Sequence, residues 1–268
     1  MYKIMFLIPV ILFTGISIPQ EAFGGELKLS IVYNNVPYDE DLACSWGMGC
    51  VVQGIPRTIL FDTGGDGDIL LSNMEKMGIE PDEIDLVVLS HIHGDHTGGL
   101  WKFLEQNSEV TVYIPASFSS SFQHRVEEAG AGVVRVKRPM EITPGVYSTG
   151  EVGTWIKEQA LVIQSAKGLV VVTGCSHPGV DTIARRAAEY LEETIYLITG
   201  GFHLGGTSKA KIHNIIKDLN KLGVQKIAPS HCTGRKATSL FKQAWEKNFI
   251  QAGCGATISL PLPKRSVK

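Results

Sequence analysis

The chain carries the segment Ser90-His91-Ile92-His93-Gly94-Asp95-His96-Thr97-Gly98-Gly99-Leu100 directly after an apolar run, residues 86–89, that is typical of a buried strand. Four potential metal ligands fall within six of these residues: His91, His93, Asp95 and His96. Imidazole and carboxylate groups suit zinc, and also iron or manganese. Because one metal ion takes three or four such ligands, this segment alone predicts a metal site at the end of a strand.

Three further histidines, His177, His203 and His231, also stand just past predicted strands. Ligand sites of α/β proteins collect where strands end and loops converge, so we expect these side chains near the first loop. The combined set fits two adjacent divalent ions, with zinc as the first choice and manganese or iron as alternatives. By contrast, His124 and His213 lie inside predicted helices among charged neighbours, and we interpret both as surface residues.

Strands alternate with helices along the rest of the chain, and no linker rich in proline, glycine or serine divides it. This pattern predicts the α/β class, with a single domain of two packed sheets and helices outside them. The 268 residues include 25 Lys+Arg and 27 Asp+Glu, for a net charge of −2. Proteins bind the phosphate backbone of nucleic acids through clustered basic residues, whereas the charges of this chain are nearly balanced. We therefore do not expect a nucleic-acid partner.

Residues 1–24 have the pattern of an export signal: one positive charge, an uncharged run over residues 4–20, and small residues at the end. They predict a cleaved signal peptide, a mature domain of residues 25–268, and a periplasmic or extracellular location. An uncleaved membrane anchor is disfavoured because the apolar run is short and is interrupted by proline and glycine. In an exported chain, Cys44 and Cys50 are the nearest candidates for a disulfide among five cysteines.

The pattern His-x-His-x-Asp-His within residues 91–96 resembles the signature of the metallo-β-lactamase superfamily, and Asp62 resembles the aspartate of that superfamily's first motif. The resemblance implies a four-layer αβ/βα sandwich with a metal site at one edge and the activity of a metal-dependent hydrolase. Residues 173–179, 200–204 and 229–234 are further similar to a subgroup named after 7,8-dihydropterin-6-methyl-4-(β-D-ribofuranosyl)aminobenzene 5′-phosphate synthase.

The resemblance also implies a set of metal ligands. The family's middle histidine has no counterpart in residues 148–151, and His177, at a neighbouring strand end, is the residue that we expect in its place. The residues that match the family's other metal ligands are His91, His93, Asp95, His96 and His231.

Two residues are left with alternative roles. Cys175 stands where the family's bridging aspartate follows Thr-Gly, and it is either a thiolate ligand or a small buried residue. His203 is a metal ligand, a structural core histidine, or a catalytic group that donates a proton to a leaving group or stabilises an oxyanion. We favour the catalytic role for His203, because it follows a glycine-rich strand end.

The leading hypothesis is a dinuclear hydrolase in which a metal-bound hydroxide attacks a phosphoester or a related small anionic ester. Asp95 would hold metal and orient the nucleophile, and His203 would assist the leaving group. A lactam or lactone hydrolase and a non-catalytic metal-binding sensor are the alternatives, and a di-iron redox enzyme is disfavoured because no flavin or rubredoxin-like segment is present. Residues 37–49 and 139–155 are expected to shape the pocket for a small-molecule substrate, and their aromatic side chains either stack on it or belong to the core.

Overall fold

The computed structural model describes residues 25–263, which form two β-sheets. The strands of the first sheet are β1 (Glu26–Asn34), β2 (Met48–Gln53), β3 (Ile59–Phe61), β4 (Leu86–Val88), β5 (Thr111–Pro115), β6 (Gly132–Val136) and β13 (Thr257–Pro261). Those of the second are β7 (Met140–Thr143), β8 (Val146–Ser148), β9 (Leu161–Ser165), β10 (Gly168–Thr173), β11 (Ile195–Gly201) and β12 (Lys226–Ser230). Their orders are β13-β1-β2-β3-β4-β5-β6 and β12-β11-β10-β9-β8-β7.

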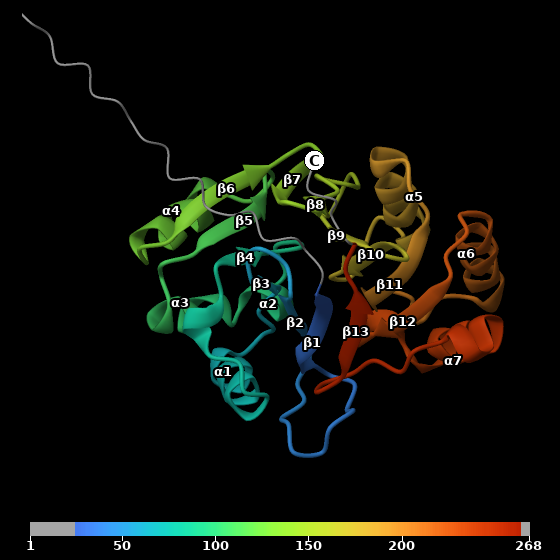
Figure 1. The fold of residues 1–268 in the computed structure, drawn as a ribbon, viewed down its shortest axis with the longest axis horizontal. Coiled ribbons are helices and arrows are strands. Elements are labelled where there is room, and N and C mark those ends of the chain that lie inside the picture. The colour runs from blue at the N-terminus through green and yellow to red at the C-terminus, as the bar shows by residue number, and fades with distance from the viewer. Residues whose placement is uncertain (1–24, 264–268) are drawn as a thin grey trace, which may run out of the picture.

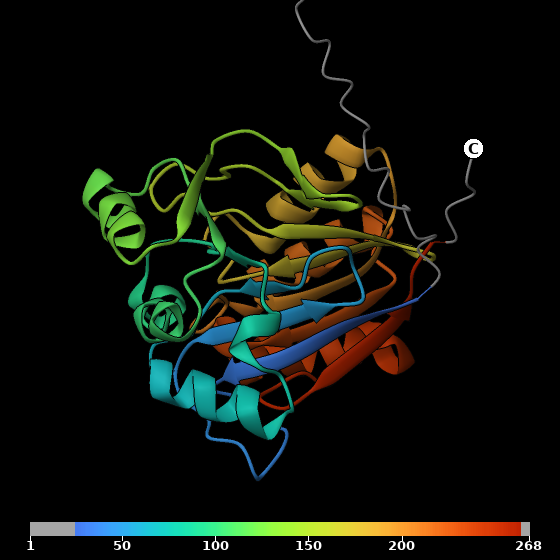
Figure 2. The ribbon, with the colours of Figure 1, turned by 60° about the vertical axis from the view of Figure 1, so that its left-hand side comes forward.

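Helices cover the outer face of each sheet (Figure 1). The helices over the first sheet are α1 (Gly67–Lys76), α3 (Leu100–Gln106) and α4 (Ser120–Glu128). The helices over the second are α5 (Val180–Leu191), α6 (Lys209–Lys221) and α7 (Arg235–Trp245). The short α2 (Gly94–Thr97) and the 3-10 turns η1 (Pro81–Glu83), η2 (His231–Thr233) and η3 (Glu246–Asn248) lie in connections. Figure 2 shows the resulting four layers, which confirm the predicted α/β sandwich.

The central strands β3, β4, β10 and β11 are buried on both faces, which explains their nearly continuous apolar sequences. Val170 and Val172 of β10 pack with Leu29 of β1 in the core between the sheets. Val171, which points the opposite way, packs with Ile183 of α5 in the outer core. Successive side chains of a strand alternate between its faces, so one apolar strand contributes to both cores.

The parallel pairing within each sheet brings several loops to one edge. β3 pairs in parallel with β4, and β10 pairs in parallel with β11, which pairs in parallel with β12. Parallel strands end at the same edge, so the residues that follow them meet there. The residues that follow these strands are Asp62 after β3, residues 90–96 after β4, residues 174–177 after β10, His203 after β11 and His231 after β12.

Two features add to the sequence-based expectations. The segment 139–155, expected to shape the pocket, contains the hairpin of β7 and β8. The candidate pair Cys44 and Cys50 is not bonded: all five cysteines are free, and Cys50 is buried between the sheets whereas Cys44 is exposed.

The prediction of a signal peptide in residues 1–24 lies outside the described residues. Within residues 25–263, none of the helices has the length and apolar character that crossing a bilayer would require.

Candidate metal centre

A first group of three imidazoles lies at the sheet edge. His91, His93 and His177 each offer a ring nitrogen, and the three atoms lie within 4.8 Å of one another. His91 Nε2 is 3.1 Å from His93 Nδ1, and the His177 ring centroid is 4.6 Å from that of His91. The structure thus brings His177 from its separate strand end to the two loop histidines that were expected to share a metal with it.

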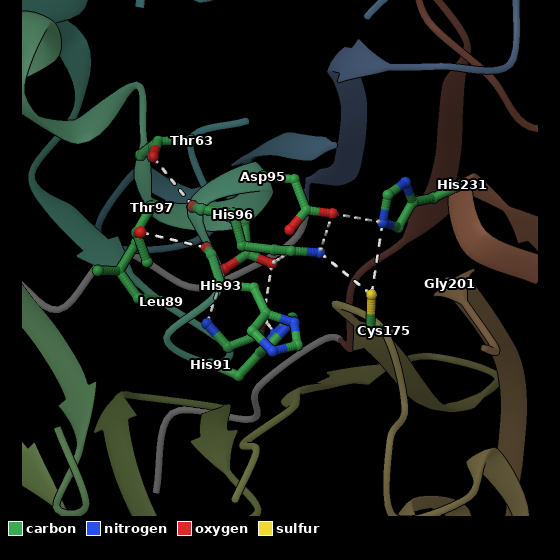
Figure 3. Close-up of polar contacts among 12 residues, drawn as sticks. Thr63, Leu89, His91, His93, Asp95, His96, Thr97, Cys175, Gly201 and His231 are labelled. Atoms are coloured by element: carbon green, nitrogen blue, oxygen red, sulfur yellow. Dashed lines mark hydrogen bonds and ion pairs between the residues drawn. The ribbon is translucent and has the colours of Figure 1, made fainter. Parts of the chain in front are cut away.

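A second group combines oxygen, nitrogen and sulfur donors (Figure 3). Asp95 Oδ2 is 3.6 Å from His96 Nε2 and 3.4 Å from His231 Nε2. Cys175 Sγ is 3.2 Å from His96 Nε2 and 3.4 Å from His231 Nε2. Four donor atoms from three separate strand ends therefore converge on one point, as a metal ion of mixed ligation requires.

Cys175 lies between the two groups. Its Sγ also lies within 4.8 Å of ligand atoms of His177 and His203. The rings of His91 and His96, one from each group, are 4.2 Å apart between centroids. Cys175 therefore neighbours donor atoms of both groups. The mixture of thiolate, imidazole and carboxylate fits zinc, whereas magnesium and calcium prefer oxygen ligands alone.

Hydrogen bonds to Nδ1 hold the two imidazoles of the second group in place. His96 Nδ1 lies 2.6 Å from Asp62 Oδ2, and Asp62 in turn accepts hydrogen bonds from the Ser90 amide and hydroxyl. His231 Nδ1 lies 2.6 Å from Asn35 Oδ1. In both rings Nδ1 is occupied and Nε2 faces the other donors, which is the arrangement that metal-binding histidines usually show.

Glu158 has the same orienting role for the first group, and the sequence analysis missed it. The carboxylate is fully buried, and its Oε1 accepts hydrogen bonds from the amides of Cys175 and Ser176, each at 2.8 Å. Its Oε2 accepts from the His177 amide at 3.0 Å and lies 3.1 Å from His177 Nδ1. Burial would raise the pKa of Glu158, but the hydrogen bond with His177, the neighbouring His91 imidazole and the backbone amides lower it to about 2. Glu158 is therefore ionised, and its carboxylate holds residues 175–177 through hydrogen bonds to all three amides.

The backbone at this edge is unusually strained. Among residues 25–263, six non-glycine residues have positive φ, and four of them belong to this region. These four are Asp62 (φ 55°), Ser176 (φ 61°), His203 (φ 48°) and His231 (φ 51°). Residues other than glycine adopt this conformation at a cost, and such residues cluster at functional sites. Each of these left-handed residues lies within three positions of the end of a strand, at the edge where the donor groups meet.

The protonation states favour metal binding near neutral pH. Burial and the neighbouring imidazoles lower the pKa of His91 to about 3 and that of His96 to about 4, so both rings are neutral. Burial would raise the pKa of Asp95, but the hydrogen bond with His231 and the neighbouring imidazoles hold it below its usual range. Neutral imidazoles and an ionised carboxylate are the forms that bind metal.

The depressed histidine pKa values predict a pH-dependent stability for the metal-free protein. Between the unfolded value near 6.5 and the folded values of about 3 and 4, the unfolded chain binds more protons than the folded one at His91 and His96. Stability should therefore be present above pH 6.5 and be lost as the pH falls towards 4. Thermal unfolding of chelator-treated protein between pH 7.5 and 4.5 should show a falling Tm. The surface variant His213→Gln should follow the same curve, and a flat Tm would contradict the assignment.

Cys232 is a second residue that the sequence analysis did not single out for the site. Its Sγ accepts a hydrogen bond from the His203 amide at 3.3 Å and lies 3.6 Å from the Cys175 carbonyl oxygen. The hydrogen bond between Cys175 and Cys232 lowers the pKa of Cys232, with a further contribution from His203, and raises the pKa of Cys175. Interaction with Cys232 in turn raises the pKa of His203, whose side chain is exposed.

All the residues expected at the site converge at this edge of the sheets, and the two histidines expected on the surface lie away from it. The residues brought together are His91, His93, Asp95, His96, Cys175, His177, His203 and His231. His124 and His213 are exposed on α4 and α6, as predicted. Glu158 and Asn35 carry no motif, and only the fold reveals their contacts with the histidines.

Known proteins share this fold and sequence pattern. Residues 51–183 match the family model of the metallo-beta-lactamase superfamily. The chain is 30% identical to the 7,8-dihydropterin-6-methyl-4-(beta-D-ribofuranosyl)-aminobenzene-5′-phosphate synthase of Methanocaldococcus jannaschii, over 84% of this chain and 92% of that protein.

Solved structures agree with the family match. One described as a metal-dependent hydrolase of the beta-lactamase superfamily superposes with a TM-score of 0.74 at 28% identity, covering 87% of this chain and 98% of that one. The metallo-beta-lactamase fold protein YhfI of Bacillus subtilis shares the fold, with a TM-score of 0.62 at 16% identity over 88% of this chain and 99% of its own. The chain therefore belongs to the metallo-beta-lactamase superfamily of metal-dependent hydrolases.

Proposed function

We propose that the protein hydrolyses a phosphoester, or a related small anionic ester, at a dinuclear and zinc-containing centre. The observation that carries this proposal is the juxtaposition of two donor groups, three imidazoles and the mixed set around Asp95, with Cys175 between them. Divalent ions held there would lower the pKa of a coordinated water and stabilise negative charge on a phosphoryl or carbonyl oxygen. The name of the Methanocaldococcus jannaschii relative refers to a phosphate-bearing compound, which supports an anionic substrate.

Two side chains are proposed to act on the reacting groups. Asp95 is a partly exposed carboxylate with a lowered pKa, so it can accept a hydrogen bond from the attacking water and orient it. His203 is exposed, and its raised pKa favours the protonated form. Its ring centroid lies 4.3 Å from that of His177, so it borders the first donor group. From this position His203 can donate a proton to the leaving group.

The variant His203→Gln tests the role of proton donor. General acid catalysis contributes about 10²–10⁴-fold, and a good leaving group needs it least. We expect kcat on diphenyl phosphate to fall by about 10²-fold or more, whereas kcat on bis(p-nitrophenyl) phosphate should fall much less. Both should be measured on zinc-loaded protein, together with zinc per chain, which should not change. His213→Gln is the matched control.

Other outcomes would point to the alternatives. If kcat fell equally on both esters and the variant bound less zinc per chain, His203 would be a metal ligand. Turnover should also be measured on cyclic nucleotides and nitrocefin. Hydrolysis of nitrocefin alone would indicate a lactam hydrolase, and turnover of none of these compounds would contradict the proposal.

A further inference from the structure

A cavity of about 700 Å³ opens beside the second donor group. His231 and Cys232 line it on the side of the metal centre, and Arg235 and Lys242 of α7 line it further out. Trp46, from the loop between β1 and β2, forms another part of its wall. The cavity therefore leads from the donor groups to a surface built by segments far apart in the sequence.

The outer wall of this cavity is basic. Arg235 and Lys242 line it there, and no aspartate or glutamate is among its lining residues. Both side chains are exposed, and neither forms an ion pair within residues 25–263. They are seven positions apart on α7, which is two helical turns, so they lie on the same side of the helix. Two unpaired cations on one wall attract an anionic group.

The cavity also offers an aromatic surface. The Trp46 side chain is 58% exposed, and its ring centroid lies 4.9 Å from that of His231. Phe249 lines the same cavity, close to Lys242. A large exposed indole beside a metal-binding histidine gives a ring of a ligand a face to stack on. The sequence allowed Trp46 either to stack on a substrate or to belong to the core. In the structure it lies at the surface of the site.

The cavity on the opposite side of the centre has a different character. It measures about 510 Å³ and is lined by His177, His203, Trp155, Ile156 and Pro178, among others, with no Lys, Arg, Asp or Glu in its wall. An uncharged leaving group fits this side, where His203 would donate its proton. Of these two cavities, the one beside His231 is the one whose wall contains arginine and lysine.

We propose that the cavity beside His231 is the subsite for a non-reacting part of the substrate: an aromatic or heteroaromatic ring that carries a second anionic group. The ring stacks on Trp46, and the second anionic group lies between Arg235 and Lys242. This inference rests on the proposed function for the location of the reacting ester, but it concerns binding and not turnover.

Equilibrium binding of ligands that cannot be hydrolysed tests the subsite separately from turnover. Zinc-loaded protein is titrated in a calorimeter with the phosphonate analogues of 4-carboxyphenyl phosphate and phenyl phosphate, which have no ester bond and differ only in the second anionic group. We expect the carboxylated compound to bind about ten-fold more tightly, since two exposed ion pairs supply an effect of this order. The double variant Arg235→Ala/Lys242→Ala should lose this preference, and Trp46→Leu should weaken both compounds.

The control has the same change in net charge outside the cavity. Lys236→Ala/Lys247→Ala should keep the wild-type preference, because neither lysine lines the cavity. If Arg235→Ala/Lys242→Ala keeps the preference, or if wild type shows none, the subsite is wrong. A preference in binding without turnover of either phosphate would overturn the proposed function alone. Turnover without the preference would overturn the subsite alone.

Discussion

Glu158→Gln is expected to lower the free energy of unfolding of the metal-free protein by about 3 kcal/mol and to weaken zinc binding about 10–100-fold. The substitution keeps the shape of the side chain but replaces one acceptor oxygen by an NH₂ group. Both carboxylate oxygens accept hydrogen bonds, from the amides of Cys175, Ser176 and His177 and from the His177 ring. At least one buried N–H would therefore face another donor.

The loss of that acceptor should affect the first donor group most. His177 would no longer be held with Nδ1 turned away from His91 and His93, so zinc at this group should be released first. Denaturant unfolding and zinc titration against a competing chelator measure the two effects.

A matched control is available on the neighbouring hairpin. Glu141 is exposed and accepts a single hydrogen bond from the Gly145 amide, so Glu141→Gln should change stability by no more than about 0.5 kcal/mol. If Glu158→Gln had wild-type stability and zinc affinity, Glu158 would not position the 175–177 loop.

Cys175→Ser is expected to remove a metal ligand, with loss of zinc from one or both donor groups. Sulfur binds zinc through the thiolate, and a serine hydroxyl at the same position ionises far less readily and is a much poorer ligand. Cobalt-substituted wild-type protein should show a sulfur-to-metal charge-transfer band in the near ultraviolet, and this band should be absent from Cys175→Ser. Zinc per chain after dialysis gives a second measurement.

Cys232→Ser serves as the control, because Cys232 adjoins Cys175 but belongs to neither donor group. It should keep both the band and the zinc. If the band survives in Cys175→Ser, the alternative of a small buried residue is correct for Cys175. If it disappears only in Cys232→Ser, the sulfur ligand is Cys232.

Much of the fold followed from local sequence. The apolar run before His91 marks a buried strand, and the spacing of His91, His93, Asp95 and His96 within one loop allows several donors to reach one place. The hairpin of β7 and β8 was not expected, because its short strands are half exposed and show no clear alternation of apolar residues. Cys44 and Cys50 were close in sequence, but the strand that holds Cys50 buries it between the sheets.

The sequence by itself predicted the α/β class and the candidate metal ligands, because periodicity and donor spacing are local properties, and the resemblance of residues 91–96 to a known signature implied the sandwich and the family. Only the tertiary structure decided how those donors are grouped and held. Strand ends that meet at one edge place His177 beside His91. Asn35 contacts His231 although the two residues are 196 positions apart in the sequence. Glu158 orients the 175–177 loop, although no pattern marks it. Such contacts depend on where the two sheets place their loops, and a buried carboxylate is recognised only by the hydrogen bonds that surround it.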